Sequence, residues 1–92
     1  MKVEQFYNAN QFHIYGVGYD ALQSYASLVA KVENGVLTLG RHWDYSKTTL
    51  KHVYLFLEEY TNVNLYEGKA NKRAYIQKLI DNGEINYDEN MI

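Results

Sequence analysis

Three side chains near the middle of the chain have the types that zinc binding requires. His42 and Asp44 stand two positions apart, so in an extended segment they point to the same side. His52 approaches them if the chain between folds back as a helix. Imidazole and carboxylate both bind zinc, and a fourth group or water would complete the site. His42, Asp44 and His52 are therefore a candidate zinc site, with His13 as a weaker fourth candidate ligand. Because their spacing matches no established zinc motif, the alternative is that they are three ordinary surface residues.

Hydroxyl groups lie between the two histidines, where nucleophilic catalysis would need them. Because the chain has no cysteine, Ser46, Thr48 and Thr49 are the candidates for such a nucleophile. Their position at the start of a predicted helix explains them instead as capping residues. Glu58 and Glu59 are adjacent, and neighbouring helix positions do not project into one cleft. We therefore predict that the protein is not an enzyme.

A β-hairpin closed at Asn34-Gly35 is the first element that must position these side chains. Asn-Gly between two apolar runs predicts a two-residue type I′ turn, which needs positive φ at both central positions. The turn fixes the register, which pairs Glu33 with Val36, Val32 with Leu37, Lys31 with Thr38 and Ala30 with Leu39. That register also separates apolar from polar side chains, so turn chemistry and hydrophobic pattern agree independently.

Two further strand segments are predicted from alternating side chains. Phe12 and Ile14 alternate with His13 and Tyr15, which is typical of a half-buried strand. After Gly40 the second hairpin strand is expected to continue to Trp43, which would fill the corner between sheet and helix. Ile85 and Tyr87 alternate with polar residues and predict a short edge strand near the C-terminus.

Two helices are predicted to cover the sheet. Asp44 or Ser46 caps the first, whose apolar stripe comprises Leu50, Val53, Tyr54, Leu57 and Tyr60, with Phe56 at its flank. The second begins near Asn71 and stops at Asn82-Gly83, as helices ending in Gly commonly do. We therefore predict one α+β domain over residues 1–92, with a small antiparallel sheet of about three to four strands packed against two helices.

Charge is unevenly distributed over a chain whose net charge is −2. The last twelve residues hold four acids and no base, namely Asp81, Glu84, Asp88 and Glu89. The preceding segment gathers the bases Lys69, Lys72, Arg73 and Lys78. Two solvated faces that partly neutralise each other are the plain explanation of this pattern. The lack of cysteine and of any long apolar run predicts a soluble protein of a reducing cytoplasm, without membrane contact.

Three stretches give the chain a family resemblance: FYNANQFHI, LQSYASLVAKVENGVLTL and HWDYSKTTLKHVYLFL. The shared features are FY-x-AN-x-F-x-I, QSY-x-S and WDYS-x-TT. Together they resemble a family of small uncharacterised domains from phages and mobile elements of Gram-positive bacteria. The resemblance spans about two thirds of the chain and is weaker from Asn62 to Ile92. Because that family has no established reaction, it implies an accessory role.

This resemblance also supplies the leading functional hypothesis. Short, acidic-tailed, tyrosine-rich proteins of such elements resemble anti-defence proteins, including anti-CRISPR inhibitors of the type II effector nuclease. Their acids can oppose the Lys and Arg that hold DNA, which is electrostatic complementarity. We therefore predict an inhibitor that binds a host defence nuclease in the host cytoplasm, through the acids Glu58, Glu59, Asp81, Glu84, Asp88 and Glu89. The alternative is a small phage nucleic-acid-binding or regulatory accessory protein that uses the basic helix at 69–78.

Overall fold

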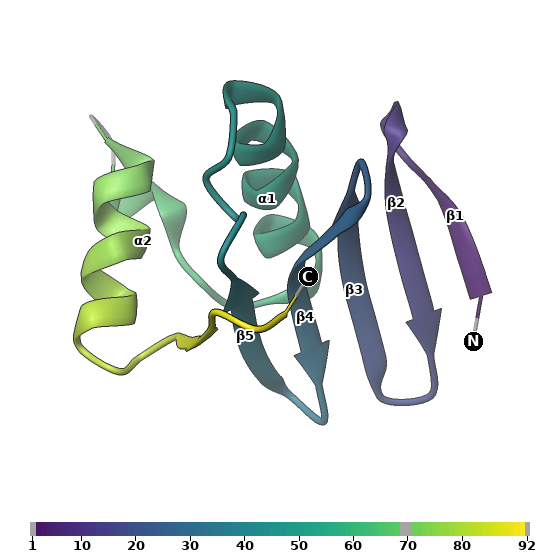
Figure 1. The fold of residues 1–92 in the computed structure, drawn as a ribbon. Coiled ribbons are helices and arrows are strands. Elements are labelled where there is room, and N and C mark those ends of the chain that lie inside the picture. Colours follow the sequence, from purple (N-terminus) through teal and green to yellow (C-terminus); the bar gives the residue numbers. More distant parts are fainter. Residues whose placement is uncertain (1, 69–70, 92) are drawn as a thin grey trace.

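A six-stranded sheet dominates the computed structural model, which describes residues 2–68 and 71–91 (Figure 1). Neighbouring strands follow chain order: β1 Lys2–Phe6, β2 Asn8–Gly16, β3 Tyr19–Ser24, β4 Ser27–Glu33, β5 Val36–Gly40 and β6 Asn86–Asp88. The first five are antiparallel, and β6 is parallel to β5. The predicted α+β class is confirmed, and the sheet is larger than the three to four strands expected.

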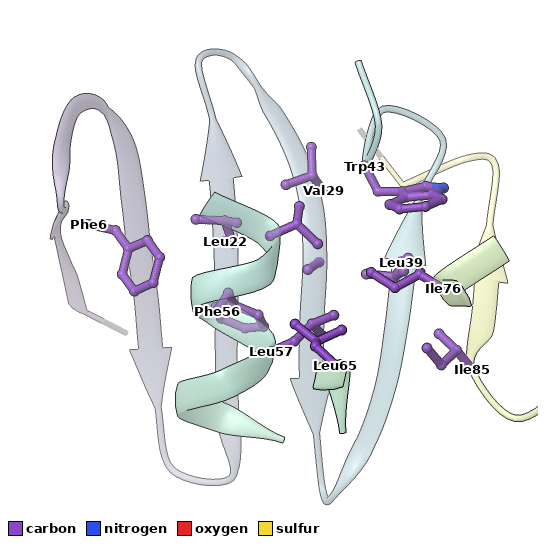
Figure 2. Packing of buried hydrophobic residues seen from close by; sticks show 12 residues of the cluster. Phe6, Leu22, Val29, Leu39, Trp43, Phe56, Leu57, Leu65, Ile76 and Ile85 are labelled. Carbon is purple, nitrogen blue, oxygen red and sulfur yellow. The ribbon is translucent and has the colours of Figure 1, made fainter. Parts of the chain in front are cut away.

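Two helices share one hydrophobic core with the sheet. They are α1 (Lys47–Tyr60) and α2 (Lys72–Asp81), separated by the short 3₁₀ helix η1 (Leu65–Gly68). Phe56 and Leu57 of α1 pack with Leu22 and Leu39 of the sheet, and Ile76 of α2 joins them (Figure 2). Within the described residues, no helix is long and apolar enough to cross a membrane.

The hairpin predicted at Asn34-Gly35 is confirmed in both turn and register. The two residues have φ values of 51° and 81°, as a type I′ turn requires. All four predicted pairs occur, from Glu33 with Val36 to Ala30 with Leu39. Ala30 and Leu39 are buried in the core, so the predicted apolar face is the one that the helices cover.

In β2 the side chains that face the core are polar. Gln11 and His13 are buried, whereas Phe12 and Ile14 are only half-buried. The reason lies in the register, because His13 pairs with Leu22, whose side chain lies in the core. The alternation therefore identifies the strand, but the apolar residues do not mark the face that α1 covers.

The segment after β5 differs from the expected strand. β5 ends at Gly40, and the next residues turn, with the Trp43 amide donating to the Gly40 carbonyl over 3.1 Å. Trp43 is nevertheless buried, as predicted for a residue between sheet and helix. Ser46 is the N-cap of α1, and its hydroxyl accepts from the Thr49 amide at 3.1 Å. Asp44 has another role, described below.

The buried face of α1 is rotated relative to the predicted stripe. Phe56, expected at the flank, is fully buried, and His52 is buried beside it. Tyr54 and Tyr60, expected in the stripe, are only partly buried and pack against the core. A wide sheet explains the rotation, since α1 packs on β3 and β4 and its flank faces β1 through Phe6.

The predicted limits of α2 and the last strand agree with the structure. Asn71 caps α2 by accepting from the Ala74 amide at 3.0 Å, and Gly83 follows its end with a φ of 77°. Ile85 is buried in the core just before β6. The C-terminal segment then crosses β5 towards β4 (Figure 1), where buried Met91 comes close to Gly40.

Candidate functional site

All six acids predicted to meet a partner lie on the surface: Glu58, Glu59, Asp81, Glu84, Asp88 and Glu89. In residues 2–68 and 71–91, none of them forms an ion pair. Glu59 accepts a hydrogen bond from the Tyr7 hydroxyl, and Asp81 accepts one from the Gln77 amide at 3.0 Å. Because such donors are neutral, these carboxylates keep their negative charge for a cation from outside.

Two of these acids, Glu59 and Glu84, line the same groove of about 860 Å³, which we call the acidic groove. Its walls are the tip of the β4–β5 hairpin, the end of α1 with residues 61–64, the inner side of α2 and residues 84–86. No Lys, Arg or His among the described residues lines it. The described part of the groove therefore combines two acidic residues with no cationic one.

The rest of the acidic groove combines apolar and amide side chains with the hydroxyl-bearing Tyr60, Thr61 and Tyr75. Its apolar members are Val32, Val36, Leu37, Val63, Leu79 and Ile85. Its amide members are Asn62, Asn64 and Asn86. An amide side chain can both donate and accept hydrogen bonds, so this lining suits a ligand with an apolar part and a polar backbone.

The other four acids are distributed over the surface. Glu58 lines a smaller hollow beside Lys72, and Asp81 lines another that includes Arg41. Asp88 ends β6, where its side chain accepts from the Asn90 amide at 2.9 Å, and Glu89 follows it. The predicted acids are thus spread over the described surface, and the acidic groove brings two of them, Glu59 and Glu84, together in one hollow.

The three residues of the candidate zinc site have separate roles. The His52 Nδ1 lies 2.7 Å from the Thr48 carbonyl, to which it donates because a carbonyl only accepts. Asp44 accepts two hydrogen bonds from Arg73, one from Nε at 3.0 Å. The His42 ring meets Tyr45 edge-on, with 5.8 Å between centroids.

These contacts leave the zinc hypothesis without support. Among the residues that the structure describes, no three His, Asp or Glu side chains are arranged to hold a metal ion. Asp44 instead joins the loop before α1 to α2 through Arg73. The sequence alone could not reveal this pair, because the two residues belong to different elements.

The basic residues of α2 are engaged within the protein. Arg73 binds Asp44 and lies over the Trp43 ring, 5.8 Å from its centroid. The Lys72 ammonium lies 5.5 Å from the centroid of the Tyr54 ring. Lys78 is exposed, and Lys69 lies outside the described residues. Two of the cations expected to bind nucleic acid therefore support the packing of α2.

A polar cluster surrounds the buried His13, and no local pattern in the sequence indicates it. Its Nδ1 lies 3.0 Å from Glu4 Oε1, and its Nε2 lies 2.8 Å from Asp20 Oδ1. The ring is stacked between Tyr15 and Tyr60, with centroid distances of 4.8 and 4.6 Å. The cluster could be found only from the β1–β2 and β2–β3 registers, which place both acids beside His13.

Tyr60 connects this cluster to the end of α1. Its hydroxyl lies 3.3 Å from His13 Nδ1, and its ring packs against the Phe56 ring with 5.0 Å between the centroids. Burial raises the pKa of Tyr60 to about 12, with the neighbouring Glu59 carboxylate adding to the effect. The phenol is therefore neutral at physiological pH. Since both nitrogens of His13 are engaged and its side chain is buried, the cluster acts as a brace between β1, β2, β3 and α1.

Two of the three hydroxyls considered as nucleophiles, those of Ser46 and Thr49, have structural partners. Thr49 is buried, and its Oγ1 lies 2.9 Å from the Ser24 Oγ. Ser24 in turn accepts from the buried Gln11 amide at 2.9 Å. Together with the Ser46 cap, these bonds give the hydroxyls at the start of α1 the structural role that the sequence predicted for them.

These features define an α+β protein in which two helices pack against an open, mostly antiparallel six-stranded sheet. The chain belongs to a family of unknown function, DUF8033, which it matches over residues 1–80. No curated protein and no solved structure matches the chain significantly. The matched region includes Glu58 and Glu59, whereas the four acids of the C-terminal end lie beyond it.

Proposed function

We propose that this protein is an anti-defence protein of phage or mobile-element type that binds a host nuclease. The proposed target is the type II CRISPR effector nuclease, and the proposed effect is to keep DNA from loading. The protein acts by binding and carries out no reaction of its own. The observation that supports this proposal is the set of exposed carboxylates that, in the described chain, have no ion-pair partner.

The physical argument concerns what such carboxylates can bind. A nuclease that holds nucleic acid has a channel rich in Lys and Arg, whose charges normally face phosphates. Carboxylates on a folded surface can meet the same cations, and opposite charge speeds the encounter. Binding of this kind weakens as salt rises, because exposed charges are screened over about 10 Å at 0.1 M salt.

Nucleic-acid binding is the alternative, and the structure favours it less. A net charge of −2 opposes approach to phosphate. Arg73 is held by Asp44 and Lys72 lies over Tyr54, so α2 offers fewer free cations than its sequence suggests. The two functions remain separable by experiment, because they depend on opposite charges.

Charge reversal with a binding readout tests the proposal. We would immobilise the protein and measure its affinity for guide-loaded type II effector nuclease and, separately, for bare DNA and RNA. The variant replaces Asp81, Glu84, Asp88 and Glu89 with Lys. The control reverses two exposed lysines on α1 with Lys47→Glu and Lys51→Glu, which leave the Asp44–Arg73 pair intact.

The proposal predicts that the acid variant binds the nuclease about tenfold more weakly or worse, while the lysine variant binds at least as well as the wild type. The wild type should bind neither DNA nor RNA at physiological salt. Tight binding of the wild type to bare DNA or RNA, lost when the exposed Lys78 of the basic helix is reversed with Lys78→Glu, would instead support the alternative function.

A further inference from the structure

We propose that the acidic groove holds an extended, cationic segment of the partner protein. The segment would have Lys or Arg side chains alternating with apolar ones. This inference rests on the proposed function in one respect, namely that the partner is a protein. It goes further by assigning the contact to one hollow and by stating which chemistry fills it.

The size and position of the groove fit such a segment. Its volume of about 860 Å³ is in the range of clefts that hold ligands, roughly 300 to 1,000 Å³. It is lined by four separate parts of the chain, from the hairpin tip at Gly35 to Asn86 in β6. A hollow of this size accepts a few residues of an extended chain.

Charge selects a cation for this groove. Glu59 comes from the end of α1 and Glu84 from the segment after α2, so two acidic residues line the hollow from different elements. One Glu59 oxygen accepts from the Tyr7 hydroxyl, which leaves the other oxygen to meet a cation. Within the part of the chain that the structure describes, no cation lines the groove to neutralise them. An Arg side chain matches a carboxylate especially well, because its planar guanidinium can donate two parallel hydrogen bonds.

The amide groups supply what an extended backbone needs. Asn62, Asn64 and Asn86 line the groove, and each side chain has both donor and acceptor groups. The Asn64 Oδ1 accepts a hydrogen bond from the Tyr66 backbone amide at 3.1 Å, so this oxygen already has a partner within the protein. Its NH₂ group is the part left to donate to a ligand carbonyl.

Apolar side chains form much of the remaining lining. Leu37, Val63 and Leu79 are partly buried and pack against the core, and Ile85 is buried. An apolar ligand side chain placed against them would lose water-exposed area, which favours binding. A strand alternates its side chains between two sides, so one side can meet apolar residues while the other meets carboxylates. This pattern is the reason for proposing an alternating segment.

Other occupants fit the same lining less well. Phosphate groups of a nucleic acid would be repelled by both carboxylates. A second copy of this chain would have to present a cationic strand, whereas β1, an edge of the sheet with four exposed residues, carries Lys2 beside Glu4. A homodimer is therefore an outcome that the experiment must detect.

A model peptide provides the test. The probe is an acetylated, amidated Leu-Arg-Leu-Lys-Leu peptide, and its matched control replaces both cations with Gln. Binding is followed by NMR titration of the full-length protein, which also locates the affected residues. The groove variant carries Glu59→Gln and Glu84→Gln, which keep side-chain shape and leave an acceptor for Tyr7. The control variant carries Asp88→Asn and Glu89→Gln, with the same change of charge outside the groove.

The inference predicts that the groove variant binds the cationic peptide at least tenfold more weakly, whereas the control variant stays within about twofold. Equal weakening in both variants would show diffuse electrostatic attraction and would overturn the inference. The inference would also fail if the wild type did not bind the cationic peptide, or bound the Gln peptide equally well. A thermal melt confirms that both variants are folded. A dimer detected by sedimentation, and abolished only in the groove variant, would also overturn the proposed occupant.

The same variants separate this inference from the proposed function. If the wild type binds the nuclease and only the control variant loses binding, the groove inference fails and the function stands. If the wild type does not bind the nuclease but binds the cationic peptide through the groove, the function fails and the groove inference stands.

Discussion

Replacing Gly40 with Ala tests how the C-terminal segment is held against the sheet. Gly40 ends β5 and is buried between two other parts of the chain. A Cβ at this position would lie 2.8 Å from the carbonyl oxygens of both Leu28 and Met91, and 3.1 Å from Met91 Cε. The shortest ordinary contact distance between a carbon and a carbonyl oxygen is about 3.3 Å. The Met91 side chain can move, but each of the two backbone carbonyls would have to move away from the new methyl group by about 0.5 Å.

The size of the effect follows from this geometry. Adding a methyl group to a filled interior costs about 1–3 kcal/mol, and obstacles on two sides place Gly40→Ala in the upper half of that range. For a chain of 92 residues, 1 kcal/mol shifts Tm by about 4–8 °C, so a loss of about 2 kcal/mol lowers Tm by about 8–16 °C.

Thermal and urea unfolding followed by circular dichroism measure this loss. Val17→Ala serves as the control, because Val17 is fully exposed and its truncation should change stability by less than about 0.5 kcal/mol. If Gly40→Ala melted like the wild type, the close packing of the segment that carries Asp88 and Glu89 would be refuted.

Four further predictions concern single sites. Folding raises the pKa of Tyr60 from 10.0 to about 12, so the stability that it contributes is complete below pH 10 and is lost between pH 10 and 12. Urea unfolding across that range should show the loss, and Tyr60→Phe should reduce it and remove the tyrosine that titrates near pH 12 in ultraviolet absorbance. Thr49→Val deprives a buried serine hydroxyl of one partner and should cost about 1–3 kcal/mol in urea unfolding; an unchanged midpoint would remove that bond from the account. Gly35→Val should lower the free energy of unfolding by about 1–2 kcal/mol through backbone strain alone, because φ is 81° and a Cβ added at this position would have no atom within 4 Å. A chelator should leave the melting temperature unchanged, since Arg73 occupies Asp44, and elemental analysis showing stoichiometric zinc would restore the metal hypothesis.

The parts of the fold that the sequence predicted are those with local signals. The Asn34-Gly35 turn fixes the pairing of its two strands by itself, and the structure has that register. The limits of α2 follow from Asn71 at its start and Gly83 after its end. Each of these features depends only on residues that are close in the chain.

A second hairpin escaped notice because its turn lacks the usual residues. β3 and β4 are joined at Tyr25 and Ala26, and Tyr25 takes a φ of 54° where Gly or Asn is normally found. Because this turn has no Asn-Gly or similar pair, the sequence does not indicate where β3 ends and β4 begins. This hairpin and β1 account for the larger sheet, and the wider sheet changes which side of α1 is buried.

The candidate site was only partly predictable for a related reason. Charged side chains are seldom buried without a partner, and all six acids are exposed. The acidic groove joins the hairpin tip, the end of α1 and the segment after α2, so Glu59 and Glu84 meet only through tertiary packing. The pairing of Asp44 with Arg73 and the cluster around His13 depend on the same long-range contacts.

An order-of-addition measurement of DNA loading tests the central claim most directly. Guide-loaded type II effector nuclease would be mixed with labelled target DNA, with this protein added either before or after the DNA, and bound DNA would be measured at equilibrium and over time. The account predicts that protein added first prevents DNA binding, that protein added after loading has little effect, and that the block weakens as salt rises. Unchanged DNA binding at a saturating concentration of the protein, in either order, would contradict it.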